Sequence, residues 1–246
     1  MSDDFGDRKF KSKADARETI WQALTERKLA RFPFPVRGRI PNFKGAEAAA
    51  RHLFTLPPWR DAKLLKINPD SPQKPVRVEA LRRGITYFMP TPRLKAGFRK
   101  FDPARIPPDK FNEAAALSSS EQWGELVALE DMPQVDAIVT GSVAVTRAGK
   151  RCGKGEGYSD IEFAILRELG HRAVPVATTV HDICLVGDFP SEPTDLPLSA
   201  IATPQGAFEI ASPLPAPAGI DWSCLTERDI EDMPVLKELR DLGNRH

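Results

Sequence analysis

Apolar residues recur along this chain with two different periods. Helical spacing predicts amphipathic helices over residues 13–30, 46–54 and 75–81, and another beyond residue 157. Short apolar runs have the length and composition of buried strands at 62–67, 85–89, 135–139, 142–146, 173–180 and 199–203. The first two runs enclose a helix, and a strand–helix–strand unit implies parallel strands joined by a right-handed crossover. The pattern therefore predicts an α/β protein with a mostly parallel sheet.

Proline-rich segments interrupt these elements. The prolines of the sequence FPFP at 32–35 exclude a continued first helix. Residues 91–109 interleave basic side chains with Phe98 and Phe101 and with prolines, so we expect a long ordered loop there. Three interpretations of this loop stay open: a lid over a substrate, a small RNA-contacting patch, or a loop whose charges keep it solvated. Beyond it, a helix capped by Ser118 or Ser119 is expected to run toward Leu129.

The C-terminal part differs in composition from the rest. The sequence SPLPAPAG at 212–219 predicts a stiff linker, and residues 226–242 predict a helix that packs on the body or on a partner. We therefore expect residues 1–211 to form one α/β domain and residues 212–246 to form a linker with a helix.

The most informative stretch is GKRCGKGEGYSDIEFAILREL at 149–169. It places Gly153, Gly155 and Gly157 between a β-rich run and a helix. A loop without Cβ atoms can turn its N–H groups toward one point, and the helix that follows adds the positive end of its dipole. This arrangement predicts an anion site, and a phosphate is the expected ligand.

Charged side chains in the same stretch agree with a phosphate ligand. Lys150, Arg151 and Lys154 are donors suited to phosphate oxygens, and Asp160 is a carboxylate suited to holding Mg²⁺ beside them. The residues alone therefore suggest ATP handling. The glycine spacing matches neither the Walker pattern nor the dinucleotide fingerprint, so a plain turn is the alternative.

The longer string is more specific. GxRxGxGxGYxD followed by a helix resembles the signature of the 5-formyltetrahydrofolate cyclo-ligase (methenyltetrahydrofolate synthetase) family, and GSVAVT before it and EPTDLPLSAIATPQG after it resemble flanking family segments. This resemblance covers residues 135–206. It implies a three-layer domain in which helices flank the sheet, and ATP- and Mg²⁺-dependent cyclisation of 5-formyltetrahydrofolate to 5,10-methenyltetrahydrofolate.

The same resemblance implies roles for individual residues. Arg151 and Tyr158 would be catalytic, with Tyr158 shaping the site, and Asp160 would bind Mg²⁺. The residues that would bind the nucleotide are Arg17 in the first helix, Lys150, Gly153, Lys154, Gly155 and Gly157.

Several positions depart from the family pattern. Ser159 stands where a second Tyr is usual, Ile161 replaces an Arg, Cys152 replaces a Leu, and NPDSPQKPVR replaces a Glu-containing turn that helps to hold the folate. These departures resemble the methenyltetrahydrofolate synthase domain-containing type. They leave open a second hypothesis, an inactive nucleotide- or folate-binding relative that acts as a regulatory or RNA-associated module.

Composition limits the other function classes. The net charge of +1 over 246 residues gives no global attraction to nucleic acid, and no apolar run approaches the ~20 residues that span a bilayer. We expect a cytoplasmic monomer or homodimer that binds a small folate-like molecule and neither a membrane nor nucleic acid. The three cysteines are expected to be reduced thiols. The adjacent pair His181–Asp182 is expected to be structural, because neighbours on a strand point to opposite sides.

Overall fold

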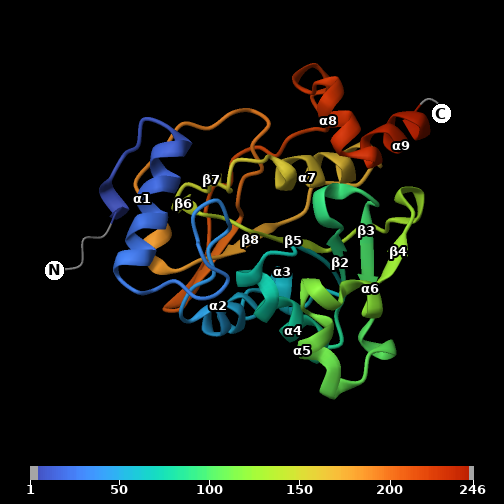
Figure 1. Ribbon diagram of the computed structural model, residues 1–246, viewed down its shortest axis with the longest axis horizontal. Helices are drawn as coiled ribbons and strands as arrows, with labels where there is room; N and C mark the ends of the chain where they lie inside the picture. Colours follow the sequence, from blue (N-terminus) through green and yellow to red (C-terminus); the bar gives the residue numbers. More distant parts are fainter. Residues whose placement is uncertain (1–4, 244–246) are drawn as a thin grey trace.

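A computed structural model describes residues 5–243 as a three-layer α/β fold. Its main sheet has eight strands in the order β11-β10-β8-β5-β1-β2-β3-β4 (Figure 1). The strands from β10 to β2 are parallel, while β11, β3 and β4 pair antiparallel at the two edges. The strand bounds, in chain order, are Leu64–Ile67 (β1), Thr86–Pro90 (β2), Phe98–Phe101 (β3), Glu125–Val127 (β4), Ala137–Thr140 (β5), Val176–Thr179 (β8), Ala200–Thr203 (β10) and Gly206–Glu209 (β11).

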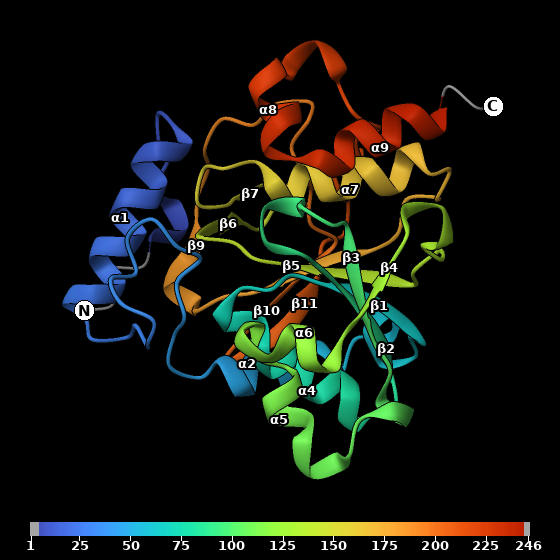
Figure 2. The same ribbon diagram turned by 45° about the vertical axis from the view of Figure 1, so that its right-hand side comes forward.

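Helices cover both faces of this sheet (Figure 2). On one face lie α2 (Ala46–Leu53), α3 (Pro57–Arg60, labelled in Figure 1), α4 (Lys74–Arg82), α5 (Phe111–Ala114) and α6 (Ser120–Trp123). On the other lie α7 (Tyr158–Glu168), α8 (Glu227–Asp232) and α9 (Pro234–Gly243), with α1 (Lys13–Glu26) to one side. Within the described residues, no helix is long and apolar enough to cross a membrane.

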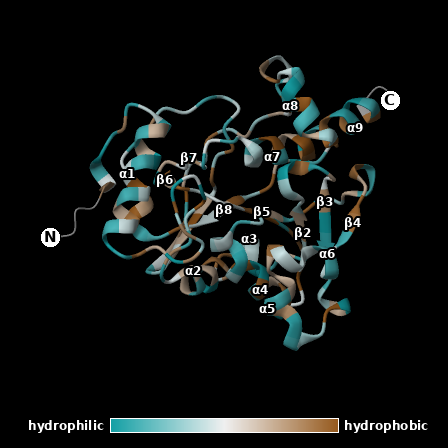
Figure 3. Ribbon diagram, viewed as in Figure 1, coloured by the Kyte–Doolittle hydropathy of each residue, from teal (hydrophilic) through white to brown (hydrophobic). Residues whose placement is uncertain are grey.

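Alternating side chains of the strands build a separate core on each face. In β5, Ala137 and Val139 pack with α2, α3 and α4, whereas Ile138 packs in the cluster that contains the apolar faces of α1 and α7. Figure 3 shows hydrophobic residues toward the interior and hydrophilic ones on outer turns such as those of α5. The predicted strand–helix–strand unit is confirmed, because β1 and β2 are parallel and α4 connects them.

A second sheet, of three strands, leads into residues 153–157, which contain Gly153, Gly155 and Gly157 and are called the glycine stretch below. This sheet consists of β6 (Ala144–Thr146), β7 (Arg151–Cys152) and β9 (Leu185–Val186), in the order β7-β6-β9. The glycine stretch therefore leaves a short strand of this small sheet rather than a strand of the main parallel sheet. It still leads directly into α7, as the sequence predicts.

Several expectations for secondary structure were wrong. Residues 91–109 are not all loop, because β3 lies within them; its Phe101 is fully buried and stacks on Tyr87 with ring centroids 4.6 Å apart. The helix expected from Ser118 or Ser119 to Leu129 is only the single turn α6, and β4 follows. Gly124 ends that turn: a Cβ there would lie 2.6 Å from Phe101 Cζ.

The predicted C-terminal helix is two helices. α8 ends at Asp232 and α9 begins at Pro234, because proline lacks the N–H that a continuous helix needs. Val235 and Leu236 of α9 are buried in the same core as α7. The C-terminal segment thus packs on the body of the protein.

Candidate functional site

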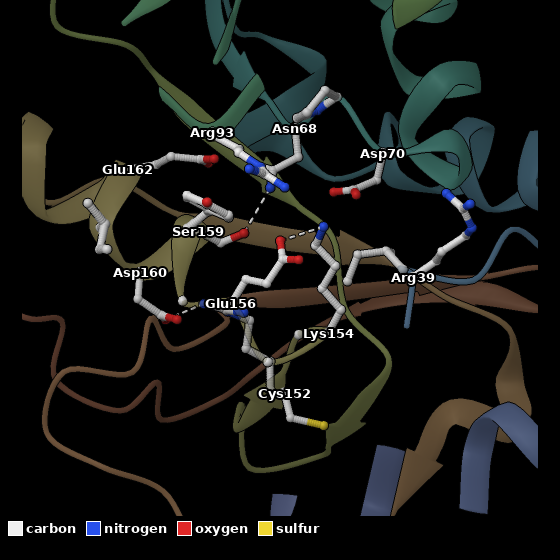
Figure 4. A pocket seen from close by; sticks show the side chains of 18 of the residues that line it. Arg39, Asn68, Asp70, Arg93, Cys152, Lys154, Glu156, Ser159, Asp160 and Glu162 are labelled. Carbon is white, nitrogen blue, oxygen red and sulfur yellow. Dashed lines mark hydrogen bonds and ion pairs between the residues drawn. The ribbon is translucent and has the colours of Figure 1, made fainter. Parts of the chain in front are cut away.

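A cavity of about 1230 Å³ lies between α1, the glycine stretch and the loop that follows β1. Figure 4 shows Asn68 and Asp70 on one side of it and Glu156 and Asp160 on the other. Its volume exceeds the ~300–1,000 Å³ of a typical small-molecule site, so it has room for two ligands. The predicted site residues that line it are Arg17, Arg151, Gly153, Lys154, Gly155, Gly157, Tyr158 and Asp160.

The glycine stretch lines this cavity and ends at the N-terminus of α7. Gly155 has φ +108° and Gly157 has φ +72°, a left-handed backbone that favours glycine. Gly157 is also the N-cap of α7 and supplies no side-chain capping bond. The first N–H groups of this helix therefore have no capping acceptor from the N-cap side chain, and they carry the positive end of its dipole.

Arg17 of α1 lies over the same stretch. A Cβ on Gly155 would lie 3.5 Å from the Arg17 guanidinium carbon. This guanidinium is half-buried and makes no ion pair with any described residue. Neighbouring cations are already paired: Lys154 contacts Glu156 at 2.6 Å, and Lys13 contacts Asp195 at 2.5 Å. Arg17 is thus a charged donor available to an anion at the glycine stretch.

Asp160 has partners of its own. Its Oδ1 accepts hydrogen bonds from the buried Arg151 guanidinium and, at 2.7 Å, from the backbone N–H of Leu196. Its other oxygen has no hydrogen-bond partner among the described residues. Within residues 5–243 no group of three or more His, Cys, Asp or Glu side chains is arranged to hold a metal ion. A Mg²⁺ ion on Asp160 would therefore take its other ligands from phosphate and water, as this ion commonly does.

Lys150 lies outside the cavity. Its Nζ donates to Asp188 Oδ1 at 2.7 Å and to the carbonyl of Phe189 at 3.1 Å. These bonds tie the turn between β6 and β7 to the segment after β9. Lys150 thus makes structural contacts with Asp188 and Phe189 and does not line the cavity with the glycine stretch.

Comparison with known proteins agrees with this arrangement of glycines and charges. The sequence profile of the 5-formyltetrahydrofolate cyclo-ligase family matches residues 9–204. The chain belongs to this family. The resemblance predicted from the glycine string is thereby confirmed, including the methenyltetrahydrofolate synthase domain-containing type.

Individual relatives define the match further. The chain is 41% identical over 239 residues to the methenyltetrahydrofolate synthase domain-containing protein of Bos taurus, covering 93% of this chain and 62% of that protein. The Homo sapiens protein of the same name is 37% identical, with 93% of this chain and 61% of that protein covered. The chain thus spans about three fifths of the length of these relatives. The 5-formyltetrahydrofolate cyclo-ligase of Mycolicibacterium smegmatis is 30% identical over 115 residues, which covers 38% of this chain and 56% of that protein.

A solved structure shows the same fold. The NMR structure of Aquifex aeolicus 5,10-methenyltetrahydrofolate synthetase superposes with a TM-score of 0.50 at 18% identity, covering 81% of this chain and 93% of that one. At this identity the likeness concerns the fold alone. It confirms the cyclo-ligase-like α/β domain predicted from the sequence.

The cyclo-ligase fold brings further polar residues to the cavity that the sequence did not single out. The fully buried Lys66 of β1 forms an ion pair with the equally buried Glu162 of α7 and donates to Asn68 Oδ1 at 2.5 Å. Asn68 Nδ2 in turn donates to Ser159 Oγ at 2.8 Å, as Figure 4 shows. This network fastens the end of β1 to the first turns of α7, and so joins the two sides of the cavity.

Burial shifts the pKa values of two charged groups in and beside this network. Burial lowers the pKa of Lys66, and the neighbouring Glu162 opposes that shift. Burial likewise raises the pKa of Asp70, which lines the cavity after β1. Asp70 belongs to the sequence in which the family's Glu-containing turn has no clear counterpart.

Arg77 fixes the backbone that carries Asn68 and Asp70. Its buried guanidinium donates to the carbonyls of Pro69 at 3.1 Å, Asp70 at 3.2 Å, Ala115 at 2.9 Å and also Asn68. Burial lowers the pKa of Arg77 to about 10, which still leaves it charged at neutral pH. One signal could have located this turn: ligands of open α/β sheets bind beyond the carboxyl ends of parallel strands, and β1 ends here.

The remaining walls come from distant parts of the chain. Arg93, from the basic stretch at 91–109, lines the cavity with φ +54°. Ile220 and Leu225 of the C-terminal segment line it as well, although the family match ends at residue 204. His181, in contrast, caps a short 3-10 helix by accepting from the Ile183 N–H at 3.2 Å, a structural role as the sequence predicts.

Proposed function

We propose that this protein is an ATP- and Mg²⁺-dependent ligase that converts 5-formyltetrahydrofolate to 5,10-methenyltetrahydrofolate. The observation that carries the proposal is one cavity in which an anion-binding glycine stretch faces an independent set of polar side chains. Membership of the cyclo-ligase family supports the reaction class. The volume of about 1230 Å³ is compatible with a nucleotide and a folate bound together.

The phosphates of ATP bind at the glycine stretch. The N–H groups at the start of α7 and the free guanidinium of Arg17 supply donors and positive charge there. Lys154 adds a cation that exchanges its Glu156 partner for phosphate. The absence of a side chain at Gly155 leaves the space between this loop and Arg17 open.

Arg151 and Asp160 act together beside these phosphates. Arg151 holds one oxygen of Asp160, which lines the cavity, and the other oxygen would be available to hold Mg²⁺. Tyr158, at the first position of α7, shapes the wall. When bound, MgATP supplies the phosphoryl group that turns the formyl oxygen of the substrate into a leaving group.

The folate occupies the side of the cavity that carries Asn68 and Asp70. These residues and Glu162 offer acceptors for the N–H groups of the ring system. The Arg77 clamp keeps the loop after β1 in one conformation, so the formyl group is held close to the phosphates. Positioning and charge neutralisation thus account for most of the catalytic demand.

Turnover tests this proposal directly. Purified protein with ATP, Mg²⁺ and 5-formyltetrahydrofolate should develop methenyl absorbance at the ultraviolet edge of the visible, with one ADP formed per methenyl group. Arg17→Met should lower kcat by about 100-fold, because a phosphate-directed donor is lost. The matched control is Arg31→Met: Arg31 forms a surface ion pair with Glu47 at 3.3 Å and does not line the cavity, so kcat should stay unchanged. A flat absorbance trace beside an active cyclo-ligase standard would refute the folate assignment.

A second candidate is a nucleotide- or folate-binding relative without turnover, acting as a regulatory or RNA-associated module. The observation in its favour is that Ser159 and Glu162 are already bonded to Asn68 and Lys66. Calorimetry distinguishes the two, since this candidate binds ATP without releasing ADP. A cytoplasmic location, the oligomeric state and the domain boundary at residue 211 stay predictions from the sequence.

A further inference from the structure

Two phenylalanines are unusually exposed in the loop between α1 and α2. Phe32 is 77% exposed and Phe34 60%, the highest values among the large hydrophobic residues that the structure describes as exposed. The loop passes beside α1 in both ribbon views (Figures 1 and 2). Phe32 and Pro33 line the cavity, whereas Phe34 does not. An exposed aromatic ring is a common feature of a contact surface, and here one of the two phenylalanines lines a candidate ligand site.

The Phe32 backbone is held in place from several directions. Its carbonyl accepts from Asn42 Nδ2 at 2.8 Å, and the Arg31 N–H donates to the Asn42 carbonyl at 2.9 Å. The Arg39 carbonyl accepts from Trp21 Nε1 of α1 at 3.0 Å. The ring is therefore presented on an ordered loop, and little conformational entropy is lost when a ligand packs against it.

The same loop is anchored next to the phosphate-binding side chain of the proposed function. Arg37 forms an ion pair with Glu18 at 2.8 Å, and Glu18 follows Arg17 in α1. Arg39 and Ile40 of the loop also line the cavity, and Figure 4 shows Arg39 on the side of Asp70. The Arg39 Nε donates to the Pro35 carbonyl at 3.1 Å, which fixes this side chain. Phe32, Arg39 and Ile40 of one loop thus line the same cavity as the cationic Arg17.

This combination suits a planar heteroaromatic ring joined to a polyanion. Flat π-systems stack on phenylalanine and on guanidinium planes, and apolar side chains fill their edges. The polyanion of such a ligand would reach Arg17 and the glycine stretch. A purine nucleotide has both parts.

We propose that Phe32 is the stacking platform for the base of the nucleotide whose phosphates bind at Arg17 and the glycine stretch. The inference rests on the proposed function for the nucleotide itself. It adds a base subsite, and it explains why an exposed phenylalanine is held at the edge of the cavity. Phe34 provides the matched control, because it is in the same loop, also precedes a proline, and lies off the cavity.

Calorimetry with two ligands tests this inference. Mg²⁺ with ATP and Mg²⁺ with inorganic tripolyphosphate are titrated into the wild-type chain and into the variants Phe32→Ala, Phe32→Tyr and Phe34→Ala. Phe32→Ala should weaken ATP binding by about 10-fold, within the range for loss of one stacked base, and leave tripolyphosphate binding unchanged. Phe32→Tyr and Phe34→Ala should bind both ligands like the wild type.

Three results would overturn the inference in different ways. Unchanged ATP affinity in Phe32→Ala removes the base subsite and leaves the phosphate site intact. Loss of 5-formyltetrahydrofolate affinity with unchanged ATP affinity assigns the ring to the other substrate instead. A wild type that binds neither ATP nor tripolyphosphate rejects the nucleotide site itself, and with it the proposed function.

Discussion

Separating the buried pair Lys66–Glu162 should cost more stability than any single surface change. Their side chains are 1% and 5% exposed, and removal of either leaves a charge or a protonated acid at a buried position. Breaking a buried pair from one side typically costs about 3–5 kcal/mol. We expect a loss near the lower end for Glu162→Leu, because Asn68 still accepts from Lys66 at 2.5 Å.

The double variant Lys66→Met/Glu162→Leu separates pairing from packing. Both new side chains are apolar and fill similar volumes, so the desolvation cost of two charges is removed together with their attraction. The double variant should lie within about 1 kcal/mol of the wild type, which corresponds to a coupling of roughly 5 kcal/mol or more between the two positions. Such a value would be a large part of the ~5–15 kcal/mol stability of a typical domain.

Urea unfolding followed by far-ultraviolet circular dichroism measures these differences. The control is Arg228→Met, which removes one partner of the surface pair with Asp232, 3.8 Å apart and 89% and 62% exposed; the midpoint should not move. If each single variant at the buried pair costs less than about 1 kcal/mol and the two effects add, the reasoning from burial is refuted.

Three further predictions concern the glycine stretch and a capping histidine. Asp160→Asn should abolish the Mg²⁺ dependence of ATP affinity and cost about 1–3 kcal/mol in urea unfolding, since the buried Arg151 loses its counter-charge; unaltered MgATP binding would contradict the metal role. Gly155→Ala should weaken tripolyphosphate binding in calorimetry because φ is +108°, whereas Gly153→Ala, without a left-handed backbone, should weaken it less; equal effects would count against the backbone argument. Burial lowers the pKa of His181 in the folded protein below its usual 6.5. As the pH drops, the unfolded chain therefore takes up this proton before the folded protein does. The free energy of unfolding should fall as the pH drops through 6.5 toward the lower pKa of the folded state. His181→Asn, which keeps an N-cap acceptor, should show a smaller fall in denaturant titrations at pH 7.5 and 5.5, and an identical fall would exclude this histidine.

The sequence predicted well those parts of the fold whose signal is local. The glycines and the helix α7 that follows them are neighbours in the chain. Gly157 has a left-handed backbone, which glycine adopts without help from distant residues. The family resemblance was also local in this sense, since it depended on the glycine string and on the segments that flank it, within residues 135–206. Periodicity also located α1, although α1 ends at Glu26 where longer helix was expected, and Lys28 has φ +55°.

The parts that the sequence missed depend on distant partners. β4 has mostly exposed residues, including Leu126 at 54%, and exists because it pairs with β3. The bond between Asn68 and Ser159 joins residues 91 positions apart, and Asp160 accepts from a backbone N–H 36 positions away. No periodicity or motif encodes such contacts, so the polar network that lines the cavity could be identified only from the three-dimensional structure.

The central claim is that the formyl oxygen of the folate receives the phosphoryl group of ATP inside this cavity. It is tested most directly with 5-formyltetrahydrofolate labelled with ¹⁸O in the formyl group, incubated with the protein and MgATP, followed by mass analysis of the inorganic phosphate. When N10 of the folate closes on the formyl carbon, the C–O bond breaks and phosphate leaves with that oxygen. We expect one ¹⁸O atom in each phosphate released during methenyl formation. Unlabelled phosphate, or ATP hydrolysis without any methenyl product, would contradict it.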